Sequence, residues 1–203
     1  MKTLYPSLFL ILLLAGPAAG ERQDFKIGEQ NAFVLPPAED QRIEGPMPWV
    51  WYAPAFHHKL PGPEENWMIE RFHASGIAIA GIDVGESFGS PKGRASYEKL
   101  YEELVKKRGF SPKPVLLARS RGGLMLYSWA VEHPEQVGGI AGIYPVCDIA
   151  SYPGLKRAAP AYGLSAEELK KQLTQHNPVD RLAPLAKART PIFHIHGDQD
   201  RVV

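Results

Sequence analysis

The chain of 203 residues has a single cysteine, little net charge and no long apolar run. Its one cysteine, Cys147, cannot form a disulfide within the chain. A formal net charge of +1 gives no reason to expect a nucleic-acid partner or attraction to an anionic membrane. No internal repeat or low-complexity tract is visible. The length therefore predicts one globular domain with a sizeable core.

The longest apolar run, residues 8–14, is too short for a membrane-spanning helix, which needs roughly 20 residues. Lys2 precedes this run, and small residues at Ala18 and Gly20 favour cleavage before Glu21. Residues 1–20 are therefore predicted to be a signal peptide. No cysteine stands directly after this run, so a lipid anchor is not expected. We expect an exported protein, periplasmic or secreted, with no stable membrane association after cleavage.

After an irregular or hairpin segment at residues 21–47, apolar strand-like runs alternate with helical patterns. The predicted strands cover residues 48–53, 77–82, 114–118, 140–144 and 191–195. The predicted helices cover residues 64–75, 97–109 and 124–133. Such alternation is typical of an α/β domain with a doubly wound, mostly parallel sheet.

Residues 150–178 interrupt this alternation. Inside them Ser165 and Glu168 form a capping-box pattern, which predicts a helix to about Gln175. We expect this insertion to form a small helical cap over the carboxyl edge of the sheet, within a single domain at residues 21–203.

Two serines compete for the role of nucleophile. Ser87 lies in a literal G-x-S-x-G string at 85–89, whereas Ser120 has an alanine two residues before it. A nucleophile elbow needs a strand that runs into the serine, a helix directly after it, and small residues two positions before and after. These requirements can be compared at both sites.

Ser120 meets them, because an apolar strand leads in and Gly122 and Gly123 allow a helix to pack closely. After Ser87, the residues Gly89, Pro91 and Gly93 are not expected to continue a helix. Residues 83–93 are therefore predicted to form a loop that lines the pocket, and Ser120 is predicted to be the nucleophile. The alternative for Ser120 is a tight strand–helix turn without chemistry.

The elbow around Ser120 and the terminal sequence from His196 to Asp200 resemble the α/β-hydrolase superfamily. The resemblance covers residues 48–203 and is closest to the prolyl-oligopeptidase-like and dienelactone-hydrolase-like branch. It implies that Asp200, in the motif H-G-x-x-D-x-V, is the acid of a catalytic triad, with Asp198 as its competitor.

In this fold the triad residues follow the order Ser, Asp, His. All seven histidines precede Asp200. The resemblance therefore implies that the chain lacks the catalytic histidine, together with the last strand and helix of the sheet, and that this fragment is inactive.

Backbone donors for the oxyanion can be assigned from chemistry. One should be the N–H of Arg121, which follows the nucleophile. Since Pro54 has no N–H, the other must come from Ala55 or Phe56. The residues expected to line the pocket are Tyr52, Asp83, Glu86, Arg119 and Tyr144. The two arginines beside the serine, Arg119 and Arg121, either bind an anionic substrate group or pair with nearby carboxylates.

Two rival functions remain open. His194 and His196 match part of an H-x-H-x-D zinc string, although Gln199 replaces its final histidine. A non-catalytic binding protein on a hydrolase scaffold is the second rival. The favoured interpretation is a serine hydrolase that acts on small-molecule ester or peptide substrates and needs no metal or organic cofactor. Cys147 is expected to be a small buried side chain.

Overall fold

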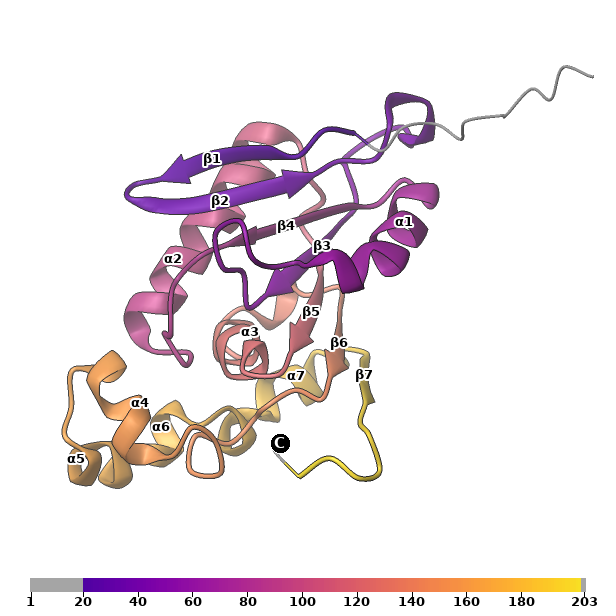
Figure 1. The fold of residues 1–203 in the computed structure, drawn as a ribbon. Helices are drawn as coiled ribbons and strands as arrows, with labels where there is room; N and C mark the ends of the chain where they lie inside the picture. The colour runs from indigo at the N-terminus through magenta and orange to yellow at the C-terminus, as the bar shows by residue number, and fades with distance from the viewer. Residues whose placement is uncertain (1–19, 202–203) are drawn as a thin grey trace, which may run out of the picture.

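The computed structural model describes residues 20–201, and its centre is a seven-stranded sheet with the order β1-β2-β4-β3-β5-β6-β7 (Figure 1). Strands β3 to β7 pair in parallel, and β1 and β2 add an antiparallel hairpin at one edge. The strands are β1 Gln23–Ile27, β2 Gln30–Leu35, β3 Trp49–Ala53, β4 Ala78–Ile82, β5 Val115–Arg119, β6 Gly139–Ile143 and β7 Ile192–Ile195. The predicted mostly parallel α/β class is confirmed.

Helices lie on both faces of this sheet. They are α1 Asn66–Ala74, α2 Pro91–Glu102, α3 Gly122–Ala130, α4 Leu155–Tyr162, α5 Ala166–Lys171, α6 Leu173–His176 and α7 Ala183–Lys187. Shorter turns are η1 Glu39–Gln41, η2 Pro63–Glu65, the π-helical η3 Glu103–Lys107, η4 Pro134–Gln136 and η5 Pro178–Arg181. None of the helices in residues 20–201 is long and apolar enough to cross a membrane.

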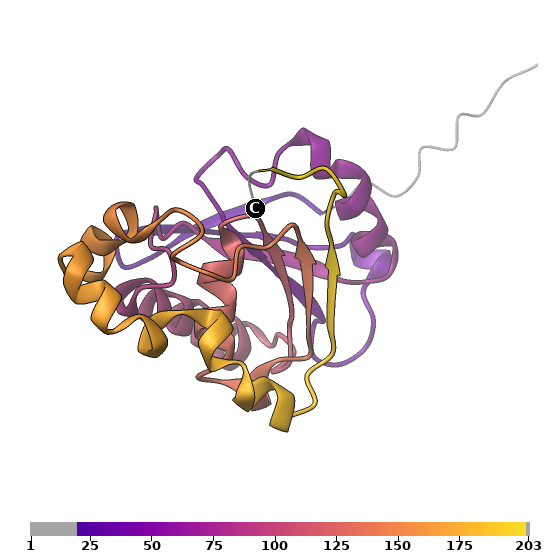
Figure 2. The ribbon, with the colours of Figure 1, turned by 90° about the horizontal axis from the view of Figure 1, so that it is seen from below.

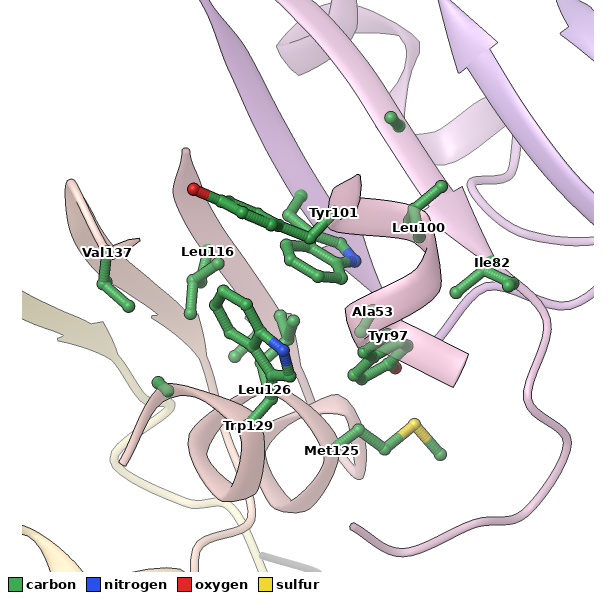
Figure 3. Packing of buried hydrophobic residues seen from close by; sticks show 14 of the residues in the cluster. Ala53, Ile82, Tyr97, Leu100, Tyr101, Leu116, Met125, Leu126, Trp129 and Val137 are labelled. Carbon is green, nitrogen blue, oxygen red and sulfur yellow. The ribbon is translucent and has the colours of Figure 1, made fainter. Parts of the chain in front are cut away.

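Strand β3 is buried on both faces and separates two layers of core. Its odd-numbered residues face α2 and α3, where the ring centroids of Trp51 and Trp129 are 4.7 Å apart and those of Trp51 and Tyr97 are 5.4 Å apart. Figure 3 shows Tyr97 and Trp129 in this layer. Val50 and Tyr52 face the opposite layer, which includes α1. Dense packing on both sides fixes the carboxyl end of β3, next to which the candidate site lies.

The order in which the chain visits the strands reverses at β3. From β3 the chain crosses outward to β4, and from β4 it returns past β3 to β5. In open α/β sheets, ligands bind in the crevice at the carboxyl ends of the strands where the order reverses. The carboxyl ends of β3 and β5 are therefore the place to look for a site.

One predicted helix begins earlier than expected. The prediction that Pro91 and Gly93 could not continue a helix is wrong, because α2 begins at Pro91. Proline is favoured at the first helical position, because an N–H at that position would have no acceptor within the helix. The Ser90 hydroxyl caps this helix by accepting a hydrogen bond from the Gly93 N–H at 3.4 Å. The loop after β4 is therefore shorter than predicted and ends at Ser90.

Residues 150–178 contain α4, α5 and α6, which lie on the other side of the molecule from β7 (Figure 2). The predicted capping box is present, with the Ser165 hydroxyl accepting from the Glu168 N–H at 3.2 Å. The helices pack against the loop after β4, and the Tyr162 hydroxyl donates to the Phe88 carbonyl at 2.8 Å. The predicted signal peptide, apart from Gly20, lies outside the described residues and remains a prediction.

Candidate active site

Ser120 occupies the turn between β5 and α3, and its backbone is left-handed with φ 49°. A residue other than glycine adopts this conformation only where its surroundings enforce it. The Ser120 N–H donates to the Ile143 carbonyl at 3.0 Å. The Ser120 carbonyl accepts from the N–H groups of Gly123 and Val146, both at 2.9 Å. Three backbone hydrogen bonds therefore hold this strained turn.

The two glycines after Ser120 allow backbone to approach backbone. A Cβ atom on Gly122 would lie 2.0 Å from the Ala53 carbonyl oxygen, and one on Gly123 would lie 2.2 Å from the Val146 carbonyl oxygen. Real Cβ atoms essentially never come so close to another atom. The start of α3 is therefore pressed against the end of β3, as the predicted close packing requires.

Ser120 lines a cavity of about 190 Å³. Its other lining residues are Pro54, Phe56, Leu60, Arg119, Arg121 and Tyr144. Typical small-molecule sites measure roughly 300–1,000 Å³. The cavity beside the serine therefore suits a small chemical group. Its lining combines apolar residues from the loop after β3 with the polar side chains of Arg119 and Tyr144.

Backbone N–H groups are available at this cavity. Within residues 20–201, no hydrogen bond uses the N–H of Arg121, Ala55 or Phe56. By contrast, the next N–H in the same loop, that of His57, donates to the Asp83 carboxylate at 3.0 Å. This bond anchors the loop beside Ser120. Arg121 and Phe56 line the cavity, whereas Ala55 does not, and the role of these N–H groups as oxyanion donors stays a prediction.

Arg119, directly before the serine, is held by a buried polar network. Its Nη1 donates to the Glu65 carboxylate at 3.0 Å and to the Tyr52 hydroxyl at 3.3 Å, and its Nε donates to the Tyr144 hydroxyl at 3.1 Å. The side chain of Glu65 is only 7% exposed. Tyr52 donates its own proton to Glu65, and burial together with this carboxylate raises the pKa of Tyr52. The network makes Arg119 a fixed part of the cavity wall.

Only two of the five residues predicted to line the pocket do so, namely Arg119 and Tyr144. Tyr52 is buried in the core behind Arg119. The Asp83 carboxylate accepts from the N–H groups of His57 and Gly85, so it braces two loops. Glu86 forms an ion pair with Arg121. These three residues do not line the cavity beside Ser120, and their polar groups contact Arg119, Arg121 and the loops; their role in substrate binding stays a prediction.

Ser87 differs from Ser120 in its surroundings. It is 6% exposed, and its hydroxyl packs against Gly93 of α2 without a hydrogen-bond partner in the described chain. The left-handed residues near it are Gly85, Phe88 and Gly89, not the serine itself. Ser87 borders a different cavity, of about 510 Å³, between α2 and the β1–β2 hairpin.

The segment after β7 carries the other predicted residues. His194 Nε2 is 2.6 Å from the Tyr127 hydroxyl, and the rings of His194 and His196 are 5.8 Å apart. Burial, with a smaller effect of His196, lowers the pKa of His194. In residues 20–201, no group of three or more His, Cys, Asp or Glu side chains is arranged to hold a metal ion.

Asp200 follows β7 in a turn, where its N–H donates to the Gly197 carbonyl at 3.1 Å. Because β7 is parallel to β6 and β5, this turn lies at the same edge of the sheet as Ser120. No histidine of the described residues lines the cavity beside Ser120.

Solved structures resemble this chain over most of its length. An S-formylglutathione hydrolase from Agrobacterium tumefaciens superposes with a TM-score of 0.66 at 14% identity, covering 90% of this chain and 76% of that one. Est1E from Butyrivibrio proteoclasticus superposes with a TM-score of 0.63 at 17% identity, and the match covers 91% of this chain and 80% of Est1E. This chain has the α/β-hydrolase fold. The fold that the sequence motifs implied is confirmed.

A prolyl endopeptidase is another structural neighbour, with a TM-score of 0.65 at 19% identity. The match covers 90% of this chain but only 30% of the endopeptidase. No family model matches the chain, and no curated protein sequence matches it significantly. At these identities the likeness establishes the fold, and any activity must be argued from the site.

Proposed function

We propose that this α/β-hydrolase-fold protein is a serine hydrolase that cleaves ester or peptide bonds by acyl transfer to water, with Ser120 as its nucleophile. The observation that carries the proposal is the left-handed backbone of Ser120, φ 49°, at a strand–helix turn beside a cavity. A turn of this kind presents the serine hydroxyl above the sheet, where a substrate carbonyl can reach it.

In the proposed reaction the Ser120 hydroxyl attacks the carbonyl carbon and gives its proton to a general base. The carbonyl oxygen then becomes an oxyanion, which the N–H of Arg121 and that of Ala55 or Phe56 would stabilise. A single donor of this type contributes roughly 10²–10³ in kcat in other hydrolases. The leaving group departs with a proton, and water then attacks the acyl-enzyme and releases the acid.

We assign Asp200 as the acid that orients the base. Since the triad order in this fold is Ser, Asp, His, the proposed base is a histidine that follows Asp200 in the protein sequence.

The cavity of about 190 Å³ supports a small acyl group in the substrate. Two of the structural neighbours are named an S-formylglutathione hydrolase and a prolyl endopeptidase, so this fold serves both kinds of hydrolysis. Fold likeness alone does not choose between them. The small cavity favours esters with short acyl chains as the first substrates to test.

A fluorophosphonate probe on the full-length gene product tests the proposal. We expect the probe to label Ser120, with labelling and ester hydrolysis lost in Ser120→Ala and kept in the matched control Ser87→Ala. Labelling that survives Ser120→Ala and is lost in Ser87→Ala would overturn the choice of nucleophile. An unlabelled wild-type protein that hydrolyses no ester would favour a non-catalytic binding protein on the same scaffold.

A further inference from the structure

Tyr144 lines the Ser120 cavity and is held at two points, its backbone N–H and its hydroxyl. Tyr144 follows β6, and its backbone is left-handed with φ 38°. Its N–H donates to the Ile195 carbonyl of β7 at 2.7 Å, and its hydroxyl is 3.1 Å from Arg119 Nε. These contacts hold the tyrosine in one orientation beside the nucleophile.

The direction of the hydrogen bond from Arg119 leaves Tyr144 with a free proton. A guanidinium group only donates hydrogen bonds, so the Tyr144 oxygen accepts from Nε and its own O–H proton points elsewhere. Within residues 20–201, no protein group accepts that proton. Tyr52 contacts the same guanidinium, but its proton is donated to Glu65. Tyr144 is therefore the hydroxyl of this network that can donate into the cavity.

Register places this donor next to the nucleophile. Arg119 of β5 pairs with Ile143 of β6, so the next residues, Ser120 and Tyr144, leave the sheet side by side. Both line the cavity, together with the apolar residues Pro54, Phe56 and Leu60. An acyl group attached to Ser120 would therefore meet both apolar contacts and the Tyr144 donor.

The charges around Arg119 indicate which acceptor suits this donor. Two carboxylates contact the guanidinium, Glu65 at 3.0 Å and Glu64 at 3.5 Å. With both ionised, the cluster carries a net negative charge, which disfavours a carboxylate on the substrate. A neutral acceptor, such as an ether or carbonyl oxygen, is free of that repulsion.

We propose that Tyr144 determines acyl specificity by donating a hydrogen bond to a neutral oxygen in the substrate acyl group. The preferred substrates are then esters of short acyl chains that carry an ether or carbonyl oxygen, over apolar chains of the same size. Arg119 acts through Tyr144 as a positioning residue. The inference rests on the proposed function, because it assumes that Ser120 carries the acyl group.

The test uses the full-length gene product and two esters, 4-nitrophenyl methoxyacetate and 4-nitrophenyl butanoate. They share a leaving group and chain length and differ by an oxygen in place of a methylene. We expect the ratio of their kcat/KM values to fall by about 2–10-fold in Tyr144→Phe, the effect of one neutral hydrogen bond. Comparing this ratio between proteins cancels the intrinsic reactivity of each ester.

Tyr101→Phe is the matched control. It also removes one hydroxyl, which donates to the Pro112 carbonyl at 2.9 Å on the far side of α2, and the ratio should not change. A thermal melt verifies that each variant folds. Arg119→Lys is a second variant that keeps the positive charge beside Glu65 but not the planar donor set that fixes Tyr144, so it should lower the ratio too.

The outcomes separate the two proposals. If both esters require Ser120 and the ratio is unchanged in Tyr144→Phe and Arg119→Lys, the specificity role is wrong and the hydrolase proposal stands. If hydrolysis survives Ser120→Ala, or neither ester is hydrolysed, the hydrolase proposal fails and the role of Tyr144 fails with it.

Discussion

Gly122→Ala should damage both the stability of the fold and the geometry of the site. The added Cβ would lie 2.0 Å from the Ala53 carbonyl oxygen, 2.3 Å from the Ala53 carbonyl carbon and 2.6 Å from the Pro54 nitrogen. All three atoms belong to the backbone, so no side-chain rotation relieves the contact. The start of α3 and the end of β3 must move apart.

The size of the effect follows from these distances. Ordinary contact begins at 3.4 Å, so the carbonyl oxygen must retreat by about 1.4 Å. Overpacking of this kind typically costs about 1–3 kcal/mol in the free energy of unfolding. For a domain of this size, that loss lowers Tm by roughly 2–12 °C. The same movement shifts the proposed oxyanion donors of Ala55 and Phe56, and a misplacement of about 1 Å can reduce kcat by roughly 10²-fold.

Urea unfolding and ester hydrolysis of the full-length gene product measure both effects. Gly139→Ala is the matched control, because a Cβ there meets its nearest atom, the Pro191 carbonyl oxygen, at 3.4 Å. This control should unfold within about 0.5 kcal/mol of the wild type. The reasoning is refuted if Gly122→Ala unfolds as the control does and keeps its kcat, because β3 and α3 would then not be in the tight contact described.

Three further predictions concern the end of the chain and the cysteine. Asp200→Asn should lower kcat by roughly 10²–10⁴ while Asp198→Asn has a mild effect; the reverse result would exchange their roles. Burial raises the pKa of the Cys147 thiol to about 11, so the thiol stays protonated at neutral pH. Its alkylation by iodoacetamide should rise about tenfold per pH unit up to that pKa, and rapid alkylation at pH 7 would contradict the burial. The apolar side chains of β7 are exposed: Ile192 by 47%, Phe193 by 65% and Ile195 by 56%. Residues 21–203 should therefore self-associate, and Phe193→Lys should reduce the self-association measured by light scattering. A monodisperse unsubstituted chain would contradict this prediction.

The sequence was sufficient to predict the sheet and the turn at Ser120, for local reasons. Short apolar runs bounded by glycine and proline mark strands, and β3 to β7 lie within a residue or two of their predicted positions. The elbow depends on small residues at fixed spacing from the serine, which neighbouring sequence supplies. Both signals are carried by residues close together in the chain.

Other features depend on contacts between distant segments and could not be predicted in this way. The contact of the Tyr52 hydroxyl with Glu65 and Arg119 was not predicted, because it depends on the path of the loop after β3. Leu60 lines the cavity for the same reason. Helices α4 and α7 contain Pro160 and Pro184, and proline hides a helical pattern even where the helix accommodates it.

The left-handed backbone of Ser120 also has a consequence for how this sequence can evolve. A residue other than glycine costs roughly 1–2 kcal/mol in that conformation, whereas glycine adopts it without strain. Ser120→Gly would therefore give a chain that is more stable by about 1 kcal/mol and has no nucleophile. In a lineage that no longer needed the reaction, mutation would move this position toward glycine. If serine is kept at this position although glycine would make the chain more stable, selection acts there on the reaction and not on folding.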